Sequence, residues 1–487
     1  DDYHLLPPES PLHALIAENL ALLPKGRNLI IAGRQAPPPA FAGLIVNRRL
    51  HCLDWQALKL SPLECRGILR LQGIAAAPRG SVKQLMKLTD GWVAGVILLL
   101  QSGDWQHLER DISELESNSL MFDYFAAEIF QRLVPETREF LLKTGLLSHM
   151  TAEAAAALAD NAGSAKILSE MAANNYFTYR RRGQPDYYEY HALFRAFLLA
   201  RAHDAFRGER LQGLLLKAAE IEKTEGRLDA AADLYAQAGA AEALTTLICE
   251  HAPTLLAQGR FSTLQDWIER IPEARREQSP WLQYWAAQCR LPFDPAAALA
   301  SFSAAFEGFQ PTGDVKGQLL SWCGVVETYV FRWDRFTELD RWIAWLDDWL
   351  SRGIDFPDTV VEGYVACAMG NALFYRQPCR SDLSGWFDRA WALAQISRDP
   401  NLLVQTVFSY IGWNIRMGAF EKSIMMLETL ERLIDLRSLS PLLQLMFKFY
   451  EAMIRWFENF SGGGQTCLEE AFALADSADI HHLDAGL

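Results

Sequence analysis

The chain has 487 residues, of which half are hydrophobic and 22% are charged. This is enough for roughly three domains with buried cores, and it excludes wholesale disorder. Its 60 acidic residues outnumber 46 basic ones, and the net charge of −14 makes it a poor non-specific binder of nucleic acid. The longest apolar run, from Trp92 to Leu100, is far too short to cross a bilayer, so no membrane partner is expected.

The first stretch, residues 1–57, has the pattern of an α/β domain. Ser10 to Leu23 carries apolar residues at helical spacing, and Asn28 to Ala32 is a short apolar run typical of a buried strand. A second short strand is predicted from Leu50 to Leu53. Two strands and one long helix cannot cover both faces of a parallel sheet, so we expect this stretch to be only part of a domain.

The second stretch, about residues 58–203, is predicted to be mainly helical and to end in a hairpin. Ser61–Glu64 combines a hydroxyl cap, a proline and an acidic residue, which together start a helix. Aromatic runs on both sides of a Gly and Pro turn between Asn175 and Tyr190 indicate a β-hairpin, so a winged-helix arrangement is favoured. The arginines 180–182 at its tip have two interpretations, a wing that contacts DNA and a set paired with acidic neighbours.

The third stretch, about residues 204–487, is predicted to be helix after helix. Joints at Gly226, Gly259 and Gly418 resemble the tight turns between the two helices of a tetratricopeptide-like hairpin. A single hairpin cannot bury its apolar face alone, so neighbouring hairpins must stack into a solenoid. The many tryptophans here are interpreted mainly as packing between helices. The eight cysteines form no CxxC pair, which favours reduced core thiols in a cytoplasmic protein.

Two short segments near the start carry the residue types of a phosphoryl-transfer site. Asp1 and Asp2 are adjacent carboxylates, of which one can be held toward Mg²⁺ and the other toward an attacking water. Arg34 follows the predicted strand at its carboxyl end, where nucleotide sites of α/β domains lie. A solvated terminus and a surface salt bridge are the respective alternatives.

In order along the chain, these motifs resemble those of MalT-like signal-transduction ATPases, known as STAND proteins. That family consists of large ATP-dependent regulators that end in a LuxR-type helix-turn-helix. The resemblance covers about the first 200 residues, whereas the later helices are similar only in architecture. Its motifs are Asp1–His4, Leu29–Pro38, Leu58–Glu64, Thr89–Gly95, Phe122–Ala126, Arg138–Thr144 and Tyr190–Leu198.

The resemblance implies a mainly α protein with four parts. These are a remnant of a P-loop α/β nucleotide-binding domain (1–57), a helical lid (58–113), a winged-helix domain (114–203) and a tetratricopeptide-like α-solenoid that acts as a sensor (204–487). It also implies roles for four residues in binding ATP or ADP with Mg²⁺. Asp1 assists the metal, Asp2 is the catalytic residue that positions water, Arg34 senses phosphate and His191 contacts bound ADP. The alternative for His191 is a histidine at a helix start that backbone groups satisfy.

The chain departs from the family pattern at the phosphate site. No GxxxxGK[ST] occurs, so the backbone cradle and the lysine that hold phosphates are not present, and Gly33 stands where the family usually has Ser before the arginine. We therefore expect a preceding segment of about 100 residues with the phosphate loop, and a following DNA reader, outside this chain. This chain alone is expected to bind ATP weakly and to have no activity. The full-length protein is expected to be at most a slow regulatory ATPase.

The resemblance implies a cytoplasmic transcriptional regulator that works as a switch. An unknown inducer on the helical repeat opens an ADP-held state, ATP replaces ADP, and subunits self-associate to present their DNA-binding domains to a promoter. Two other classes stay open: a helical adaptor or scaffold with a vestigial nucleotide site, and a working NTPase with a mechanical or enzymatic output.

Overall fold

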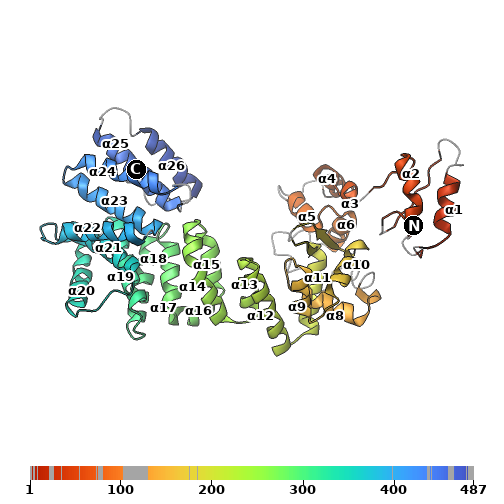
Figure 1. Ribbon diagram of the computed structural model, residues 1–487, viewed down its shortest axis with the longest axis horizontal. Coiled ribbons are helices and arrows are strands. Elements are labelled where there is room, and N and C mark those ends of the chain that lie inside the picture. The colour runs from red at the N-terminus through yellow and green to blue at the C-terminus, as the bar shows by residue number, and fades with distance from the viewer. Residues whose placement is uncertain are drawn as a thin grey trace. The chain divides into compact units, whose positions relative to one another are not determined.

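The structure is a computed structural model that divides into two compact units, Asp1–Gly239 and Ala240–Leu487 (Figure 1). Each unit is mainly helical, as the sequence predicts. The residues that the structure describes are 3, 6–7, 9–20, 27–33, 36–53, 55–72, 74, 81–102, 130–174, 176–183, 185–397, 399–435, 439, 441–458, 465–478 and 480.

The first part of the chain forms short helices and no strand in its described residues. The predicted first helix is confirmed, although α1 is shorter than expected. The two predicted strands are wrong: residues 27–33 and 49–53 have no regular secondary structure, and the Ile30 side chain is 88% exposed. A strand needs a ladder of hydrogen bonds, and the described residues give the first run only a single backbone bond, from Tyr3 to Ala32. The assignment of residues 1–57 to a nucleotide-binding domain stays a prediction. The elements are α1 (Leu12–Asn19), η3 (Pro39–Phe41), α2 (Ala42–Val46) and α3 (Trp55–Leu58).

Three helices, α4 (Pro62–Leu71), α5 (Ser81–Thr89) and α6 (Val93–Ser102), make up the described part of the predicted lid. The predicted helix start is confirmed. Ser61 Oγ accepts the backbone N–H of Glu64, and the Glu64 carboxylate accepts the backbone N–H of Ser61, which is a complete capping box. The predicted boundary between lid and winged helix, after residue 113, lies outside the described residues.

Next along the chain, helices followed by a hairpin and a last helix form the predicted winged-helix arrangement. The two strands pair antiparallel, with Thr178 opposite Tyr190, and Tyr188 also bridges to Met150. The core between helices and hairpin is aromatic, with Phe140, Phe194 and Phe197 almost fully buried. The elements are η6 (Phe130–Arg132), α8 (Pro135–Thr144), α9 (Ala152–Ala159), α10 (Ser164–Ala173), β1 (Thr178–Arg181), β2 (Tyr187–Tyr190) and α11 (Ala192–Ala205).

Two of the three hairpin arginines, Arg180 and Arg181, pair with acidic neighbours, which for them is one of the two interpretations that the sequence allowed. Arg180 donates two hydrogen bonds to Asp186 at 3.0 and 2.6 Å, and Arg181 donates two to Glu189 at 2.9 and 2.6 Å. These pairs lower the net positive charge of the hairpin, which weakens the case for a wing that binds phosphate.

The helices α12 (Glu209–Thr224) and α13 (Leu228–Gln237) form the first hairpin of the helical repeat. They belong to the same compact unit as the winged helix, because the two units divide after Gly239. The sequence placed the start of the repeat domain at residue 204. That domain boundary stays a prediction; a buried charged joint, described below, ties α12 to the winged helix.

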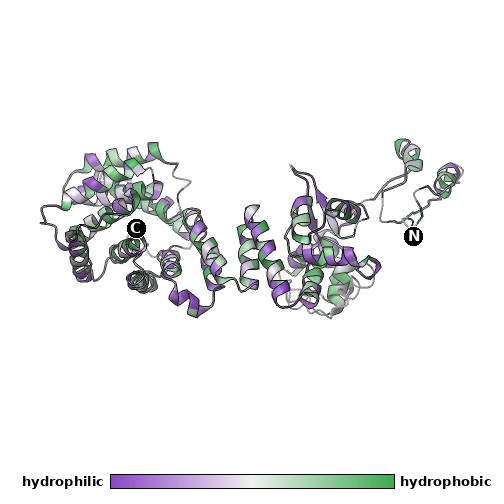
Figure 2. Cartoon of the chain, turned by 60° about the horizontal axis from the view of Figure 1, so that its bottom comes forward, coloured by the Kyte–Doolittle hydropathy of each residue, from purple (hydrophilic) through white to green (hydrophobic). Residues whose placement is uncertain are grey.

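The second unit consists of stacked helical hairpins that follow one another in a curved array (Figure 1). Figure 2 shows hydrophilic and hydrophobic residues on different sides of many of these helices, as stacking requires. Its elements are α14 (Ala241–Ala257), α15 (Phe261–Glu269), α16 (Glu273–Gln278), α17 (Pro280–Arg290), α18 (Pro295–Phe309), α19 (Val315–Arg332), η7 (Phe336–Glu338), α20 (Leu339–Ser351), α21 (Thr359–Arg376), α22 (Leu383–Ser397), α23 (Pro400–Arg416), α24 (Phe420–Leu433), α25 (Pro441–Glu458) and α26 (Gln465–Ala478).

Glycine turns and aspartate N-caps determine where several of the repeat helices end and begin. The predicted joints at Gly226, Gly259 and Gly418 are confirmed: each glycine lies between two helices with φ between +71° and +77°. Glycine adopts this left-handed conformation without steric penalty, so it ends one helix and lets the chain reverse. Aspartate N-caps start four of the helices, because each carboxylate accepts a backbone N–H of the first turn. They are Asp294, Asp314, Asp358 and Asp399.

The core of the second unit is built largely from aromatic side chains and small residues. Trp322 is fully buried on α19, and its Nε1–H donates a 3.0 Å hydrogen bond to the carbonyl of Trp342 on α20. Cys367 is also buried, and burial raises the pKa of its thiol to about 12, so it stays protonated as a core thiol. Trp333, by contrast, is 71% exposed. Most tryptophans thus act in packing, as predicted.

One carboxyl group in this core makes the stability of the second unit depend on pH. Glu327 on α19 is half-buried and forms no hydrogen bond or ion pair with the described residues. Burial raises its pKa from 4.5 to about 8. The folded chain therefore keeps a proton that the unfolded chain releases as pH rises from 4.5 to 8, so stability falls across that window. Because water screens a half-buried group in part, we expect Glu327→Gln to stabilise the chain by about 2 kcal/mol at pH 8 and negligibly at pH 4.5.

Calorimetric unfolding of both proteins at the two pH values measures this difference. Glu307→Gln is the matched control, since Glu307 is exposed on the neighbouring helix α18 and should show no pH-dependent gain. A gain of equal size at both pH values would mean that charge at Glu327 has no part in the effect.

Candidate functional site

His191 lies at the start of α11 and connects the winged helix to the lid. Its Nε2–H donates a 2.9 Å hydrogen bond to the carbonyl of Thr89, at the end of α5. Its Nδ1 accepts the backbone N–H of Leu193 at 3.3 Å and so caps α11. Only 1% of the residue is exposed, and burial lowers the pKa of the imidazole below its usual value. His191 is therefore neutral at physiological pH, with one donor and one acceptor, and both are in use.

The turn between α5 and α6 is shaped to receive His191. Asp90 and Gly91 both have positive φ, of +48° and +77°. This reverses the chain, so the N–H of Trp92 also reaches the Thr89 carbonyl at 2.8 Å. Lys59 holds the turn from outside through a 2.6 Å ion pair with Asp90.

Aromatic rings pack around the contact between this turn and the winged helix. The ring of Trp92 contacts Phe177 edge-to-face at 4.9 Å, and it lies 6.1 Å from the imidazole of His191. Phe177 is itself 5.7 Å from that imidazole. The sequence predicted the segments around Trp92 and His191 as separate motifs, and the structure brings them together.

The other predicted site residues, Asp1, Asp2 and Arg34, lie outside the described residues. Their sequence neighbours are joined by a backbone hydrogen bond of 3.0 Å, from the N–H of Tyr3 to the carbonyl of Ala32. The Tyr3 hydroxyl also donates to His13 Nδ1 at 2.6 Å. The segment after the two aspartates thus contacts the segment before Arg34.

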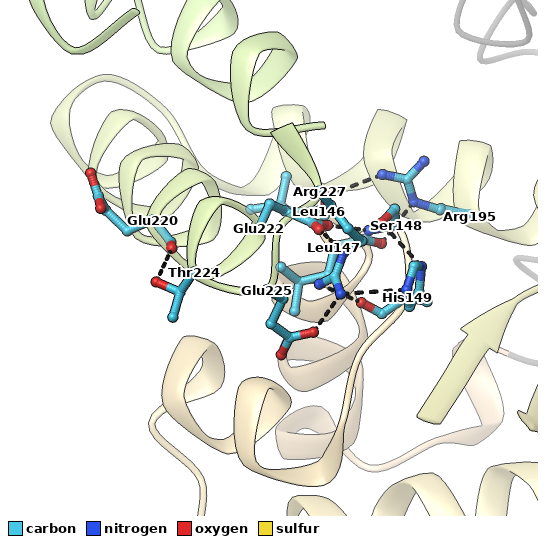
Figure 3. A network of polar contacts seen from close by, with 10 residues as sticks. All are labelled: Leu146, Leu147, Ser148, His149, Arg195, Glu220, Glu222, Thr224, Glu225 and Arg227. Carbon is cyan, nitrogen blue, oxygen red and sulfur yellow. Dashed lines mark hydrogen bonds and ion pairs between the residues drawn. The ribbon is translucent and has the colours of Figure 1, made fainter. Parts of the chain in front are cut away.

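A buried charged joint fastens the first repeat hairpin to the winged helix, and the sequence reasoning missed it (Figure 3). Glu222 on α12 is fully buried. One of its carboxylate oxygens accepts the backbone N–H of Ser148 at 2.7 Å, and the other pairs with Arg227. Arg227 also donates to the carbonyl of His149 at 3.2 Å and pairs with Glu225. We call these five residues the charged joint.

A second arginine supports the loop that the charged joint contacts. Arg195 on α11 donates to the carbonyls of Gly145, Leu146 and Leu147 at 2.9–3.1 Å (Figure 3 draws the last two). These carbonyls follow the C-terminal end of α8, where a cation also complements the helix dipole. The motif Tyr190–Leu198 thus contains two residues that hydrogen-bond other segments. His191 donates to the lid, and Arg195 donates to the loop before Ser148.

A sequence signal for the charged joint did exist. Leu215, Ala218, Ala219 and Glu222 follow one helical stripe, and the first three are buried. An acidic residue in that stripe predicts a buried carboxylate that needs a cation as its partner. Arg227, in the turn between α12 and α13, is a cation close enough in the chain to be that partner.

The second unit contains a cavity of about 780 Å³ between distant parts of its chain. One side consists of residues from α15 and from the turn between α17 and α18. The other side consists of residues from α25, α26 and the segment that follows. It has the volume of a small-molecule site.

The described residues contain neither a metal-binding cluster nor a membrane-spanning helix. No three His, Cys, Asp or Glu side chains lie close enough to hold a metal ion in this part of the chain. Over the same residues, no helix combines the length and apolar character that a membrane span needs.

Comparison with known proteins identifies the winged helix. The MalT winged helix domain family matches residues 126–210. MalT of Vibrio cholerae, an HTH-type transcriptional regulator, is 23% identical over 316 residues, which cover 62% of this chain and 34% of that protein. Serine/threonine-protein kinase PknK of Mycobacterium tuberculosis is 25% identical over 362 residues, or 70% of this chain and 31% of PknK. The chain thus spans about a third of the length of these relatives.

A solved structure shows the same fold. It is PH0952 from Pyrococcus horikoshii, a Signal Transduction ATPase with Numerous Domains (STAND) protein with a tetratricopeptide repeat sensor. Its TM-score is 0.52 at 14% identity, and the match covers 87% of this chain and 61% of PH0952. The resemblance predicted from the sequence is confirmed: the chain is MalT-like, with a MalT winged-helix domain and the fold of a STAND protein that carries a tetratricopeptide repeat sensor.

Proposed function

We propose that the full-length protein is an ATP-dependent transcriptional regulator in which the link between the lid turn and the winged helix reports the nucleotide state. The observation that carries this proposal is the buried hydrogen bond between His191 Nε2 and the carbonyl of Thr89. A neutral imidazole has one N–H donor, so it cannot donate to Thr89 and to a nucleotide phosphate at the same time. The link therefore has two exclusive states, which is what a switch needs.

For the nucleotide itself, the proposal assigns Asp1 to Mg²⁺, Asp2 to the attacking water and Arg34 to phosphate. The chemistry of these groups fits, since carboxylates bind Mg²⁺ and position water, and a guanidinium binds phosphate. The hydrogen bond between Tyr3 and Ala32 supports a shared site for the segments that carry them. Bound ATP or ADP with Mg²⁺ would supply the phosphate charge to which these residues respond. His191 would contact the phosphates of ADP after releasing Thr89.

The output and the inducer are further parts of the proposal. The relatives that share this region are a transcription regulator and a protein kinase, and these different outputs support a regulatory role for the shared region. We assign promoter binding to this protein because the winged helix matches that of MalT. Self-association in the ATP state, cytoplasmic location and an inducer on the helical repeat complete the scheme. Slow ATP hydrolysis would reset it.

His191→Ala in the full-length protein is expected to weaken ADP binding by about tenfold while changing ATP binding much less. The reason is that the variant loses the one N–H that the proposal gives to ADP. The Thr89 carbonyl keeps the N–H of Trp92, but α11 loses its cap and a buried ring is removed, so the fold should lose about 2–4 kcal/mol. Titration calorimetry with each nucleotide, together with promoter mobility shifts, measures the effect.

His203→Ala is the matched control, since His203 is exposed in the last turn of the same helix. Equal affinities of His191→Ala and the unchanged protein for ADP would contradict the proposed contact. The complete absence of ATP and ADP binding to the unchanged full-length protein would favour the helical adaptor instead.

A further inference from the structure

The cavity in the second unit has a mixed lining with an aromatic wall. Phe261 at the start of α15 and Phe293 after α17 contact edge-to-face, with ring centroids 5.8 Å apart. Phe293 is 48% exposed. Leu474 and Ile480 face the same space from the other side. An apolar ring is the ligand group that such a wall accommodates.

The cavity lining contains one cation, Arg290, and one acidic residue, Asp294, which do not pair with each other. The guanidinium of Arg290 lines the cavity and donates a 3.1 Å hydrogen bond to Ser301 Oγ. It forms no ion pair with a carboxylate of the described residues, although acidic residues outnumber basic ones, 60 to 46. Because a guanidinium binds carboxylates in a planar fork, a carboxylate is the ligand group that it suits.

A buried acceptor lies behind the wall of this space and reaches the cavity only when the side chain that carries it turns. Gln265 on α15 lines the cavity, and its amide nitrogen donates to Glu269 at 2.6 Å. Its amide oxygen is buried and has no hydrogen-bond partner in the described part of the chain. An unpaired buried acceptor is unfavourable, so a ligand that donates a hydrogen bond here would remove that penalty.

The two sides of the cavity come from opposite ends of the second unit. Gly259 lies so close to Pro441, at the start of α25, that a Cβ on the glycine would come within 2.6 Å of the proline ring. A ligand that contacts both sides binds only the arrangement in which they meet. It therefore favours that arrangement over any in which the two ends separate.

We propose that this cavity binds a small aromatic carboxylate with a hydrogen-bond donor, its ring on Phe261 and Phe293, its carboxylate on Arg290 and its donor on Gln265. This inference rests on the proposed sensor role of the helical repeat and names its ligand class. The ligand holds α15 and α25 together, and so changes the curvature of the repeat.

Three matched probes test the assignment on the full-length protein by titration calorimetry: 4-hydroxyphenylacetate, phenylacetate without the donor, and 4-hydroxyphenylethanol without the carboxylate. We expect 4-hydroxyphenylacetate to bind, and each truncated probe to bind about tenfold more weakly. Arg290→Gln should weaken 4-hydroxyphenylacetate about tenfold and leave 4-hydroxyphenylethanol unchanged. Gln265→Leu should remove the advantage of 4-hydroxyphenylacetate over phenylacetate.

Arg275→Gln is the control variant, since Arg275 is exposed on α16 and outside the cavity. Gly259→Ala, whose Cβ would push Pro441 away, should weaken all three probes and keep the helical circular dichroism of the unchanged protein. No binding of 4-hydroxyphenylacetate at about 5 mM, or equal losses for Arg290→Gln and Arg275→Gln, overturns the inference. If this probe binds as expected but leaves the ADP and promoter affinities unchanged, the cavity assignment stands and the sensor role proposed above fails.

Discussion

Glu222→Ala is expected to lower the free energy of unfolding of the first unit by about 3–5 kcal/mol. The alanine leaves the guanidinium of Arg227 without its buried partner and the backbone N–H of Ser148 without an acceptor. Both groups belong to the charged joint, where Glu222 is fully buried, so water cannot replace the lost carboxylate without opening the contact. Denaturant unfolding of the chain measures the loss. Hydrogen exchange at the Ser148 amide should accelerate strongly.

Glu225→Ala is the matched control for this prediction, because Glu225 pairs with the same arginine from a partly exposed position. An exposed pair contributes at most about 1 kcal/mol, so the control should stay close to the unchanged chain. If both variants lost the same stability, the buried carboxylate would have no special role. The winged helix and the first repeat hairpin would then be joined by apolar contacts alone.

Trp322→Ala is expected to destabilise the second unit by about 3–5 kcal/mol. The indole is fully buried between α18, α19 and α20, and removing it leaves a cavity that the surrounding rings cannot fill without moving. The Trp342 carbonyl also loses the donor that it has at 3.0 Å. Calorimetric unfolding should show a lower transition temperature for this unit, and the first unit should keep its own.

Trp333→Ala is the control, since this side chain is 71% exposed. It lies directly after α19 with φ +52°, a conformation that neither residue favours, so the exchange should change stability by less than about 0.5 kcal/mol. Comparable losses for the two tryptophans would contradict a core built around Trp322.

The charged joint bears on how the repeat could communicate with the winged helix. Arg195 and His191 lie one helical turn apart on α11, and they brace the loop before Ser148 and the lid turn respectively. A displacement of α12 therefore acts, through Glu222, on a loop that α11 also holds. Under the proposed function, this gives the sensor a continuous set of polar contacts to the nucleotide link. Glu222→Ala should accordingly uncouple inducer from nucleotide as well as reduce stability.

Local elements were largely predictable from the sequence. The capping box at Ser61 and Glu64, the aromatic hairpin before His191 and the glycine joints of the repeat all depend on neighbours within a few residues. Hydroxyl caps, paired aromatic strands and positive φ angles are local effects, which residue types at fixed spacing reveal. The order of motifs was enough for the MalT-like resemblance.

The predicted strand at Asn28–Ala32 shows where such reasoning fails. Its apolar run fits a strand, but a strand needs a ladder of hydrogen bonds, and the described residues supply only the one from Tyr3 to Ala32. The sequence reasoning missed the charged joint for a related reason. Glu222 meets the N–H of Ser148, which is 74 residues away, so no local pattern could name that partner.

By itself, the sequence determined the helical class, the winged-helix order and the repeat joints, because each follows from composition and short-range spacing. The nucleotide roles of Asp1, Asp2, Arg34 and His191 follow from the resemblance and stay a prediction. Only the tertiary structure decided that His191 donates to Thr89, that the first repeat hairpin belongs with the winged helix, and that Arg290 and Gln265 share a cavity with Pro441. These are contacts between residues far apart in the chain, and their free energy depends on burial and partner geometry that exist only once the chain has folded.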